Sequence, residues 1–353
     1  MQATICSSLL LIWVGKKIDD YKLINYSLFV IILLFLSSLF FSFINSIYFL
    51  AIGIFLMRFS GQGLMSHTSA TAITRFFDKS RGKALSTIWF GLSSAEFILP
   101  VLVTYLFIIY SWRTVWQGIA ILVMLFLPLV VLNTIKSINL DSREDEKTNL
   151  NKIKIKNWKR KEVIKDYRFY IISLNMLAMP WIATGIFVYQ SYITDSKLWS
   201  TYTIPKAFMV YSITSIITLF SSGFLVDKFT SRKLIPAMNI PLLFAMIVLF
   251  YCQNEIYAYF FLGLIGVSNG LANVLGSSTW AEIYGVKYIG SIRALTIALM
   301  VFSTAFGTAV FGILIDYGFS IERIAFISGA YIVISWVLLI IFRHTLEPVK
   351  LSK

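Results

Sequence analysis

Residues 223–233 of this chain read GFLVDKFTSRK, and residues 15–20 read GKKIDD. Each stretch places an aspartate four residues after a glycine, beside lysines and at the polar end of an apolar run. Gly15 and Asp19 stand the same 208 positions before Gly223 and Asp227 (223 minus 15, and 227 minus 19). This repetition predicts that the chain is built from two related halves.

Three weaker matches extend the repeat along the chain. They are Gly63-Leu64 with Gly270-Leu271, Ala84-Leu85 with Ala294-Leu295, and Arg113 with Arg323, at offsets of 207, 210 and 210. Each match alone carries little information. Their near-constant offset predicts two parallel bundles of six helices each.

The composition indicates that lipid is the solvent for much of this protein. Of its 353 residues 58% are hydrophobic and 14% are charged, and the mean hydropathy is +0.78. A soluble domain carries charge on about a quarter of its residues. The net charge of +14 does not indicate a nucleic-acid partner, because the basic residues lie between apolar runs instead of forming one patch. The two cysteines and two histidines are far apart, so neither a metal site nor another cofactor is expected.

Eleven apolar runs are predicted to be membrane-spanning helices, because about 20 apolar residues cover the hydrocarbon core. The first run is short, and the runs lie at residues 3–14, 26–44, 47–73, 84–109, 114–135, 168–193, 203–226, 234–252, 255–280, 293–315 and 324–342. The predicted fold class is an all-α membrane protein of two parallel-repeat bundles. Residues 1–135 form the first bundle with five spans, 136–166 a cytoplasmic basic linker, and 167–353 the second bundle with six.

The repeat also predicts that a helix is missing before Met1. Met1 corresponds to about Met209, which lies inside the second span of the second half. The first span of that half, at residues 168–193, then has no counterpart. A wrong start site or a true truncation would each give this pattern.

The lysines and arginines predict the orientation, because basic residues accumulate in cytoplasmic loops. Most of them fall in and around the linker and in the loops on its side. The opposite side holds Arg113, Lys197, Lys206 and Arg323. We therefore expect a multi-pass protein of the cytoplasmic (inner) membrane whose C-terminus is cytoplasmic.

Several motifs resemble those of the major facilitator superfamily. The stretch at 223–233 is similar to the signature loop between its second and third helices, with departures at Thr230 and Ser231. The sequence RFSGQG at 58–63 resembles its fourth-helix motif, and RFFDKSRGKA at 75–84 resembles the loop that follows. Bacterial members of monocarboxylate-porter character look most similar. The resemblance implies a secondary active transporter of two bundles that acts as a monomer.

Arg58 and Glu96 are predicted to be charges inside the membrane, which in most cases face a partner or a water-filled cavity. Arg58 would lie about 16 Å from the outer end of its helix. It is a candidate for a solute-anion anchor or for tuning a proton site, and the alternative is a structural pin. Glu96 should reach a similar depth. If it pairs with Arg58 it is structural, and if it does not it becomes a candidate proton carrier.

Four amide side chains are candidates for hydrogen bonds to a solute. Asn175 and Gln190 belong to a run that contains Pro180 and Gly185, and interrupted helices often line transporter sites. Asn269 and Asn273 lie one turn apart in a glycine-rich run. In each case the alternative is that the amide holds neighbouring helices together.

Asp19, Asp227, Arg75 and Arg232 are the candidate gating residues. The resemblance implies that the two aspartates cap or pair with the start of a neighbouring helix and so latch the cytoplasmic side shut. The alternative is a solvated loop charge. Arg75 and Arg232 belong to the same motifs and are assigned with them.

The predicted function is transport of a small solute, with an organic anion and a coupling proton as candidates. An enzyme is not expected, because the chain has no cluster of His, Asp or Glu near an interface. The remaining alternative is a non-transporting membrane sensor or an inactive, truncated transporter remnant.

Overall fold

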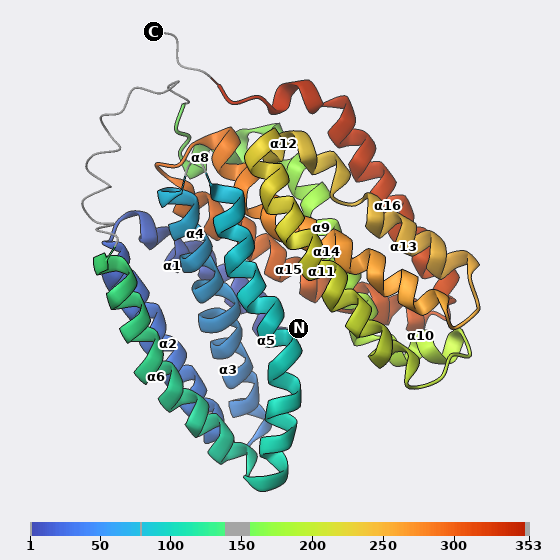
Figure 1. Ribbon diagram of the computed structural model, residues 1–353, viewed down its shortest axis with the longest axis horizontal. Helices are drawn as coiled ribbons and strands as arrows, with labels where there is room; N and C mark the ends of the chain where they lie inside the picture. Colours follow the sequence, from blue (N-terminus) through green and yellow to red (C-terminus); the bar gives the residue numbers. More distant parts are fainter. Residues whose placement is uncertain (1, 78–79, 138–155, 350–353) are drawn as a thin grey trace.

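The computed structural model describes residues 2–77, 80–137 and 156–349, and throughout these ranges the regular elements are helices (Figure 1). The first group is α1 (Gln2–Val14), η1 (Gly15–Asp19), α2 (Leu23–Ser42), α3 (Ile47–Met57), η2 (Arg58–Met65), α4 (Ser66–Phe76), α5 (Arg81–Ile109) and α6 (Trp112–Ser137). The second group begins with α8 (Arg160–Lys165), α9 (Tyr167–Val188), α10 (Gln190–Ser196), α11 (Thr203–Phe229), α12 (Ser231–Leu234) and η3 (Ile235–Ala237). It ends with α13 (Ile240–Tyr251), α14 (Tyr257–Tyr284), α15 (Ile289–Asp316), α16 (Ile321–Ile341) and η4 (Arg343–Leu346).

Each of the eleven predicted runs is helical over most of its length. In the described part of the chain, nine helices are long and apolar enough to cross a membrane, with α3, η2 and α4 counted as one and α12 to α13 as another. The two predicted spans outside this set are α1, which has 13 residues, and α5, which has 29. The prediction of an all-helical membrane protein is confirmed.

The two groups meet through two equivalent helix pairs. α1 packs on α15, and α5 packs on α11. The offset of 208 residues carries the start of α5, at Arg81, to the start of α15, at Ile289, and places α1 within α11. Exchanging the halves therefore converts one contact into the other, as a two-fold repeat requires. The expectation of a further helix before Met1 concerns residues outside this chain and stays a prediction.

Two ends of the molecule can be distinguished in Figure 1. We call the end that carries α8 and the starts of α5 and α15 the linker end, and the end with the turn between α5 and α6 the far end. At the linker end, Val163 of α8 is fully buried and packs with Phe169 and Trp280 of the second half. The predicted linker is otherwise outside the described residues, apart from its first two and last eleven positions.

Small residues bring helices of the second half into close contact. A Cβ atom on Gly266 of α14 would overlap the backbone oxygen of Tyr211 in α11, and one on Gly270 would lie 2.6 Å from that of Ser215. Thr214 donates a hydrogen bond of 2.9 Å to the backbone oxygen of Gly263 across the same pair. These contacts are van der Waals and polar, as expected where lipid supplies no hydrophobic driving force between helices.

The helix that carries Arg58 is not a regular α-helix. Between α3 and α4, the segment η2 is wound as a π-helix over eight residues. π-Segments inside α-helices are rare and occur frequently at functional sites. By contrast, α9 continues through Pro180 and ends at Val188, so the interruption expected in that run falls at Tyr189.

Replacing Gly307 by alanine should destabilise the protein. A Cβ atom at Gly307 in α15 would overlap the backbone of Trp181 in α9, which cannot move aside as a flexible side chain could. Overpacking of this kind costs about 1–3 kcal/mol. Thermal unfolding in detergent should therefore show a lower midpoint for Gly307→Ala.

The matched control is Gly118→Ala in α6, where nothing lies within 4 Å of the added atom. Alanine is the better helix former by about 1 kcal/mol, so this variant should unfold at the same or a higher temperature. Equal effects of the two substitutions would contradict the close approach of α9 and α15.

Candidate functional site

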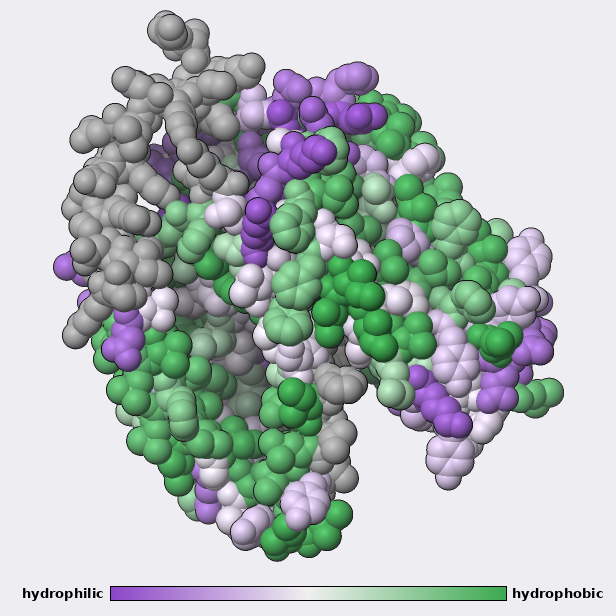
Figure 2. Space-filling view, viewed as in Figure 1, coloured by the Kyte–Doolittle hydropathy of each residue, from purple (hydrophilic) through white to green (hydrophobic). Residues whose placement is uncertain are grey.

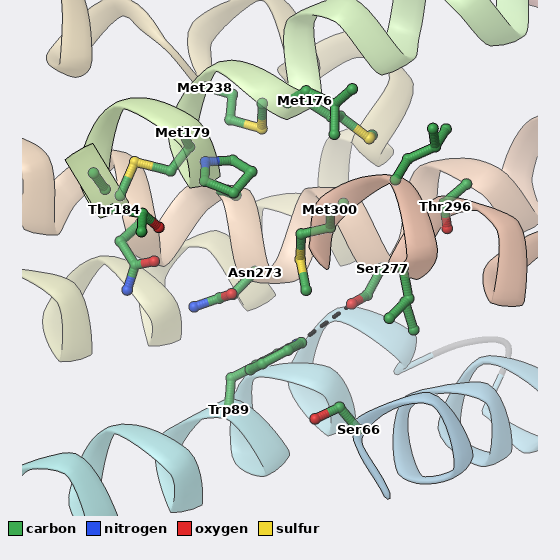
Figure 3. Close-up of a pocket in the computed structure, with 18 of the residues that line it drawn as sticks. Ser66, Trp89, Met176, Met179, Thr184, Met238, Asn273, Ser277, Thr296 and Met300 are labelled. Atoms are coloured by element: carbon green, nitrogen blue, oxygen red, sulfur yellow. Dashed lines mark hydrogen bonds between the residues drawn. The ribbon is translucent and has the colours of Figure 1, made fainter. Parts of the chain in front are cut away.

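A cavity of about 320 Å³ lies between the two halves. The first half contributes Gln62 of η2, Ser66 of α4 and Trp89 of α5. The second half contributes residues of α9, α11, α14 and α15, together with Met238. Figure 3 shows Trp89 and Ser66 on one side, opposite Asn273, Ser277 and Met300. The cavity is therefore walled by helices that are far apart in the sequence.

Apolar and aromatic side chains form much of the cavity wall, and four of them are methionines: Met176, Met179, Met238 and Met300. Thioether side chains are flexible and polarisable, so they adapt to the shape of an apolar group. Asn269, Asn273 and Thr184 add a small number of hydrogen-bonding groups. An apolar wall with a few placed polar groups is the usual lining of a small-molecule site.

Of the four predicted solute-binding amides, two line this cavity. They are Asn269 and Asn273, and Asn269 donates a hydrogen bond of 3.1 Å to the Ser215 hydroxyl. Asn175 is fully buried outside the lining, and its backbone oxygen accepts a bond of 2.6 Å from Asn239. Gln190 is exposed at the start of α10. All four side chains carry a carboxamide, so their chemistry does not show which of them line the cavity. Their positions in the fold decide it.

Arg58 lies beside the cavity instead of in its wall. Its side chain is exposed, and Nη1 donates a hydrogen bond of 2.5 Å to Oε1 of Gln62, which does line the cavity. The predicted pair with Glu96 concerns a side chain outside the described part of the structure. Arg58 therefore holds the side-chain amide of Gln62, one turn away, in the cavity wall.

Arg293 is a functional candidate that the sequence reasoning missed. It stands near the start of α15, where the distribution of basic residues predicts a cytoplasmic loop charge, yet it is only 3% exposed and lines the cavity. Among the described residues that line the cavity it alone is charged. The predicted run began at residue 293, whereas the helix begins four residues earlier, at Ile289, so the sequence placed Arg293 at the edge of a span instead of inside it.

Two carboxylates join the halves at the linker end. Asp227, near the end of α11, accepts hydrogen bonds from the backbone N–H groups of Gly82 (2.7 Å) and Lys83 (3.2 Å) at the start of α5. Asp19 accepts them from Gly290 (3.0 Å) and Ser291 (2.6 Å) at the start of α15. The first turn of a helix offers unbonded N–H groups and a partial positive charge, so it is a good partner for a carboxylate. We call these two contacts the carboxylate latches.

The two latches differ in their basic partner. Arg75 forms an ion pair of 2.6 Å with Asp19, whose side chain is 7% exposed. Burial raises the pKa of the Asp19 carboxyl, and the charge of Arg75 opposes this shift. Arg232 does not join the Asp227 latch, because its Nη1 lies 3.8 Å from Glu347 and its backbone N–H donates to Glu282.

Two related helical halves, a cavity between them and latches at one end together define a membrane transport protein. The model of the Major Facilitator Superfamily matches residues 3–291, and the chain belongs to this family. It is therefore a multi-pass membrane protein and a secondary transporter, not an enzyme. Members of the family bind small solutes and are often coupled to protons. The predicted family resemblance is confirmed, while the monocarboxylate-porter character stays a prediction.

Two solved structures are similar to this chain. One is a bacterial homologue of the iron transporter ferroportin in its outward-facing state, with 15% identity and a TM-score of 0.69. That match covers 97% of this chain and 88% of the other. The second is the proton:xylose symporter XylE with a bound bromo-deoxyglucose, with 17% identity, a TM-score of 0.66 and coverage of 97% and 85%. At these identities the likeness shows the fold. Among curated proteins there is no match.

Weakening one latch should separate the halves at the linker end. Asp227→Asn removes the charge that faces the start of α5, and a hydrogen bond to a charged group contributes about 1.5–3 kcal/mol. We expect the population of linker-end-open molecules to rise about tenfold or more. Pulsed electron paramagnetic resonance between spin labels at Lys17→Cys and Lys287→Cys, both exposed, should then show a longer distance.

The label pair requires a background in which Cys6 and Cys252 are serine. Asp195→Asn is the matched control. Asp195 lies in α10, away from the linker end, so this variant should leave the distance unchanged. An unchanged distance in Asp227→Asn as well would contradict the latch.

Proposed function

We propose that this chain moves a small solute across the cytoplasmic membrane by alternating access to the cavity between its halves. The observation that carries the proposal is the placement of the cavity and the latches. Trp89 donates a bond of 3.4 Å to Ser277 across the cavity, and both carboxylate latches lie toward the linker end. Figure 2 shows the halves parted by a notch at the far end. Rocking about the cavity would close this notch and open the latches.

The distribution of basic residues supports a cytoplasmic linker end, with the C-terminus on the same side. The conformation described would then be closed to the cytoplasm. One of the two similar solved structures is itself described as outward-facing.

Individual roles follow from position. Asn269 and Asn273 would hydrogen-bond the solute, and Arg58 would hold Gln62 toward it. Asp227, and Asp19 together with Arg75, would act as the cytoplasmic gate. Asn175, Gln190, Glu96 and Arg232 take no part in this proposal, and their predicted roles stay predictions.

The chemistry of the wall bears on the cargo. Most metal cations prefer carboxylate or imidazole ligands, and the described lining residues include neither. The thioethers of the four methionines suit only a soft ion such as Cu(I). The positive charge of Arg293 in the cavity wall also repels a cation. The similarity to a homologue of an iron transporter is thus a poor guide to the solute of this chain. An organic anion remains the better candidate.

Alternating access can be tested without knowing the solute. Asn273→Cys, in a background with Cys6 and Cys252 replaced by serine, places a thiol in the cavity. A membrane-impermeant thiol reagent should label it from the far-end side in oriented vesicles. With Asp227→Asn added, labelling from the linker-end side should rise about tenfold, because the gate is weakened.

The controls are single cysteines at Ser111, in the far-end turn, and at Lys228, at the linker end, both exposed. Each should be labelled from its own side in every variant. Labelling of position 273 from one side under all conditions would contradict transport and favour the alternative, a membrane sensor or an inactive remnant.

A further inference from the structure

Arg293 is a buried cation whose partners are all neutral. Its Nη1 donates to the backbone oxygen of Ser277 (2.7 Å) and to the Thr74 hydroxyl (3.3 Å), and its Nη2 lies 3.5 Å from the Ser277 hydroxyl. Its Nε has no hydrogen-bond partner in the described structure. Arginine can donate five hydrogen bonds, so part of this guanidinium is unused.

No carboxylate compensates this charge among the described residues. The arginine ion pairs found there join Arg75, Arg168 and Arg232 to acids, the others join Lys156 and Lys197 to glutamates, and none includes Arg293. The lining residues that the structure describes include no Asp or Glu. A buried charge without a counter-charge is costly, and proteins keep such groups where a partner or a ligand repays the cost.

Resting on the function proposed above, we propose that Arg293 binds the anionic group of the transported solute. The solute is then a small organic anion with a single charged group and an apolar body. The charge of Arg293, the one charged group among the described lining residues, sets the charge of the ligand. The methionines Met176, Met179, Met238 and Met300 provide the surface for its apolar body.

The position of Arg293 distinguishes it from Arg58. Arg58 is exposed, already donates to Gln62 and lies outside the lining, whereas Arg293 is buried with donor capacity left over. A guanidinium fork matches the two oxygens of a carboxylate or phosphate, so unused donors in the wall of a cavity favour an anion. The anchor that the sequence placed at Arg58 belongs at Arg293.

Solute binding at Arg293 would also act on the gate. Thr74 lies in α4 of the first half, while Arg293 and Ser277 lie in the second half. An anion that draws Nη1 toward the cavity weakens the bond to Thr74, which joins the halves on the linker-end side. Solute binding and separation of the two halves would thus be coupled through the Arg293 side chain.

The test compares carboxylates with their neutral amides on the purified full-length chain in detergent. The probes are two matched pairs, benzoate with benzamide and hexanoate with hexanamide, and binding is measured by calorimetry and by thermal shift. The carboxylate of at least one pair should bind more tightly than its amide. Arg293→Met should weaken carboxylate binding about 10- to 100-fold and leave amide binding unchanged. Arg293→Lys should retain part of the preference.

A stability measurement separates an anchor from a structural pin. Removing an uncompensated buried charge should leave the ligand-free Arg293→Met protein as stable as the parent or more stable. Removing a pin should lower its unfolding temperature. Arg323→Gln, which removes an exposed arginine at the far end, is the control and should change neither binding nor stability.

Three outcomes would overturn the proposal: no carboxylate binding, equal binding of acid and amide, or loss of stability in Arg293→Met. These outcomes leave the cysteine-labelling test of alternating access untouched. Two-sided labelling with no anion preference would refute the role of Arg293 alone, whereas one-sided labelling would refute transport itself.

Discussion

The structure depends on a contact between a carboxylate and the first turn of a helix in the opposite half. In a helix the first N–H groups have no partner within the helix, and water is scarce where two bundles meet. Asp19 and Asp227 supply the missing acceptors at the starts of α15 and α5. The close approach of the backbones at Gly82 and Gly223 makes this possible, because a side chain at either position would overlap the other helix. The contact is polar and its strength depends on ionisation, so it can hold the halves together without fixing them permanently.

The same physics bears on the polar groups of the cavity. Each buried polar atom must find a partner or incur a desolvation cost, and among the described lining residues Ser173 Oγ and Arg293 Nε are buried without one. Arg293 stands out because its cost is the largest and its partners are neutral. Arg58, in contrast, is exposed and carries a neutral hydrogen-bond partner, so its charge costs little where it lies. The depth of an arginine along its helix therefore did not predict its desolvation cost.

Much of the fold could be predicted because membrane-spanning helices leave a strong pattern of hydrophobicity in the sequence. A run of about 20 apolar residues has few alternatives to a spanning helix, so the eleven runs were readable within a few residues. The latch aspartates were readable because the repeat marked both. The cavity-lining residues could not be predicted in the same way, because a residue lines the cavity only if it lies on the helix face that meets it. Asn175 and Asn273 have equal chemistry, yet one is buried against Asn239 and the other lines the cavity. The π-wound segment η2 also changes the helical phase near Arg58, and hydropathy does not record such a change.

The repeat itself shows where the two halves have diverged. The latch geometry equates Gly82 with Gly290, an offset of 208, and the match of Ala84-Leu85 with Ala294-Leu295 is therefore displaced by two residues. At the offset of 208, Arg293 corresponds to Leu85, and both side chains are buried. One half thus carries an apolar packing residue where the other carries a buried charge. Packing alone would favour leucine at both positions, since a leucine there incurs no desolvation cost. Departures from the locally favourable residue are concentrated at functional sites. In the proposal that Arg293 binds the solute, this asymmetry puts the binding charge in the second half, and the first half supplies the opposite wall.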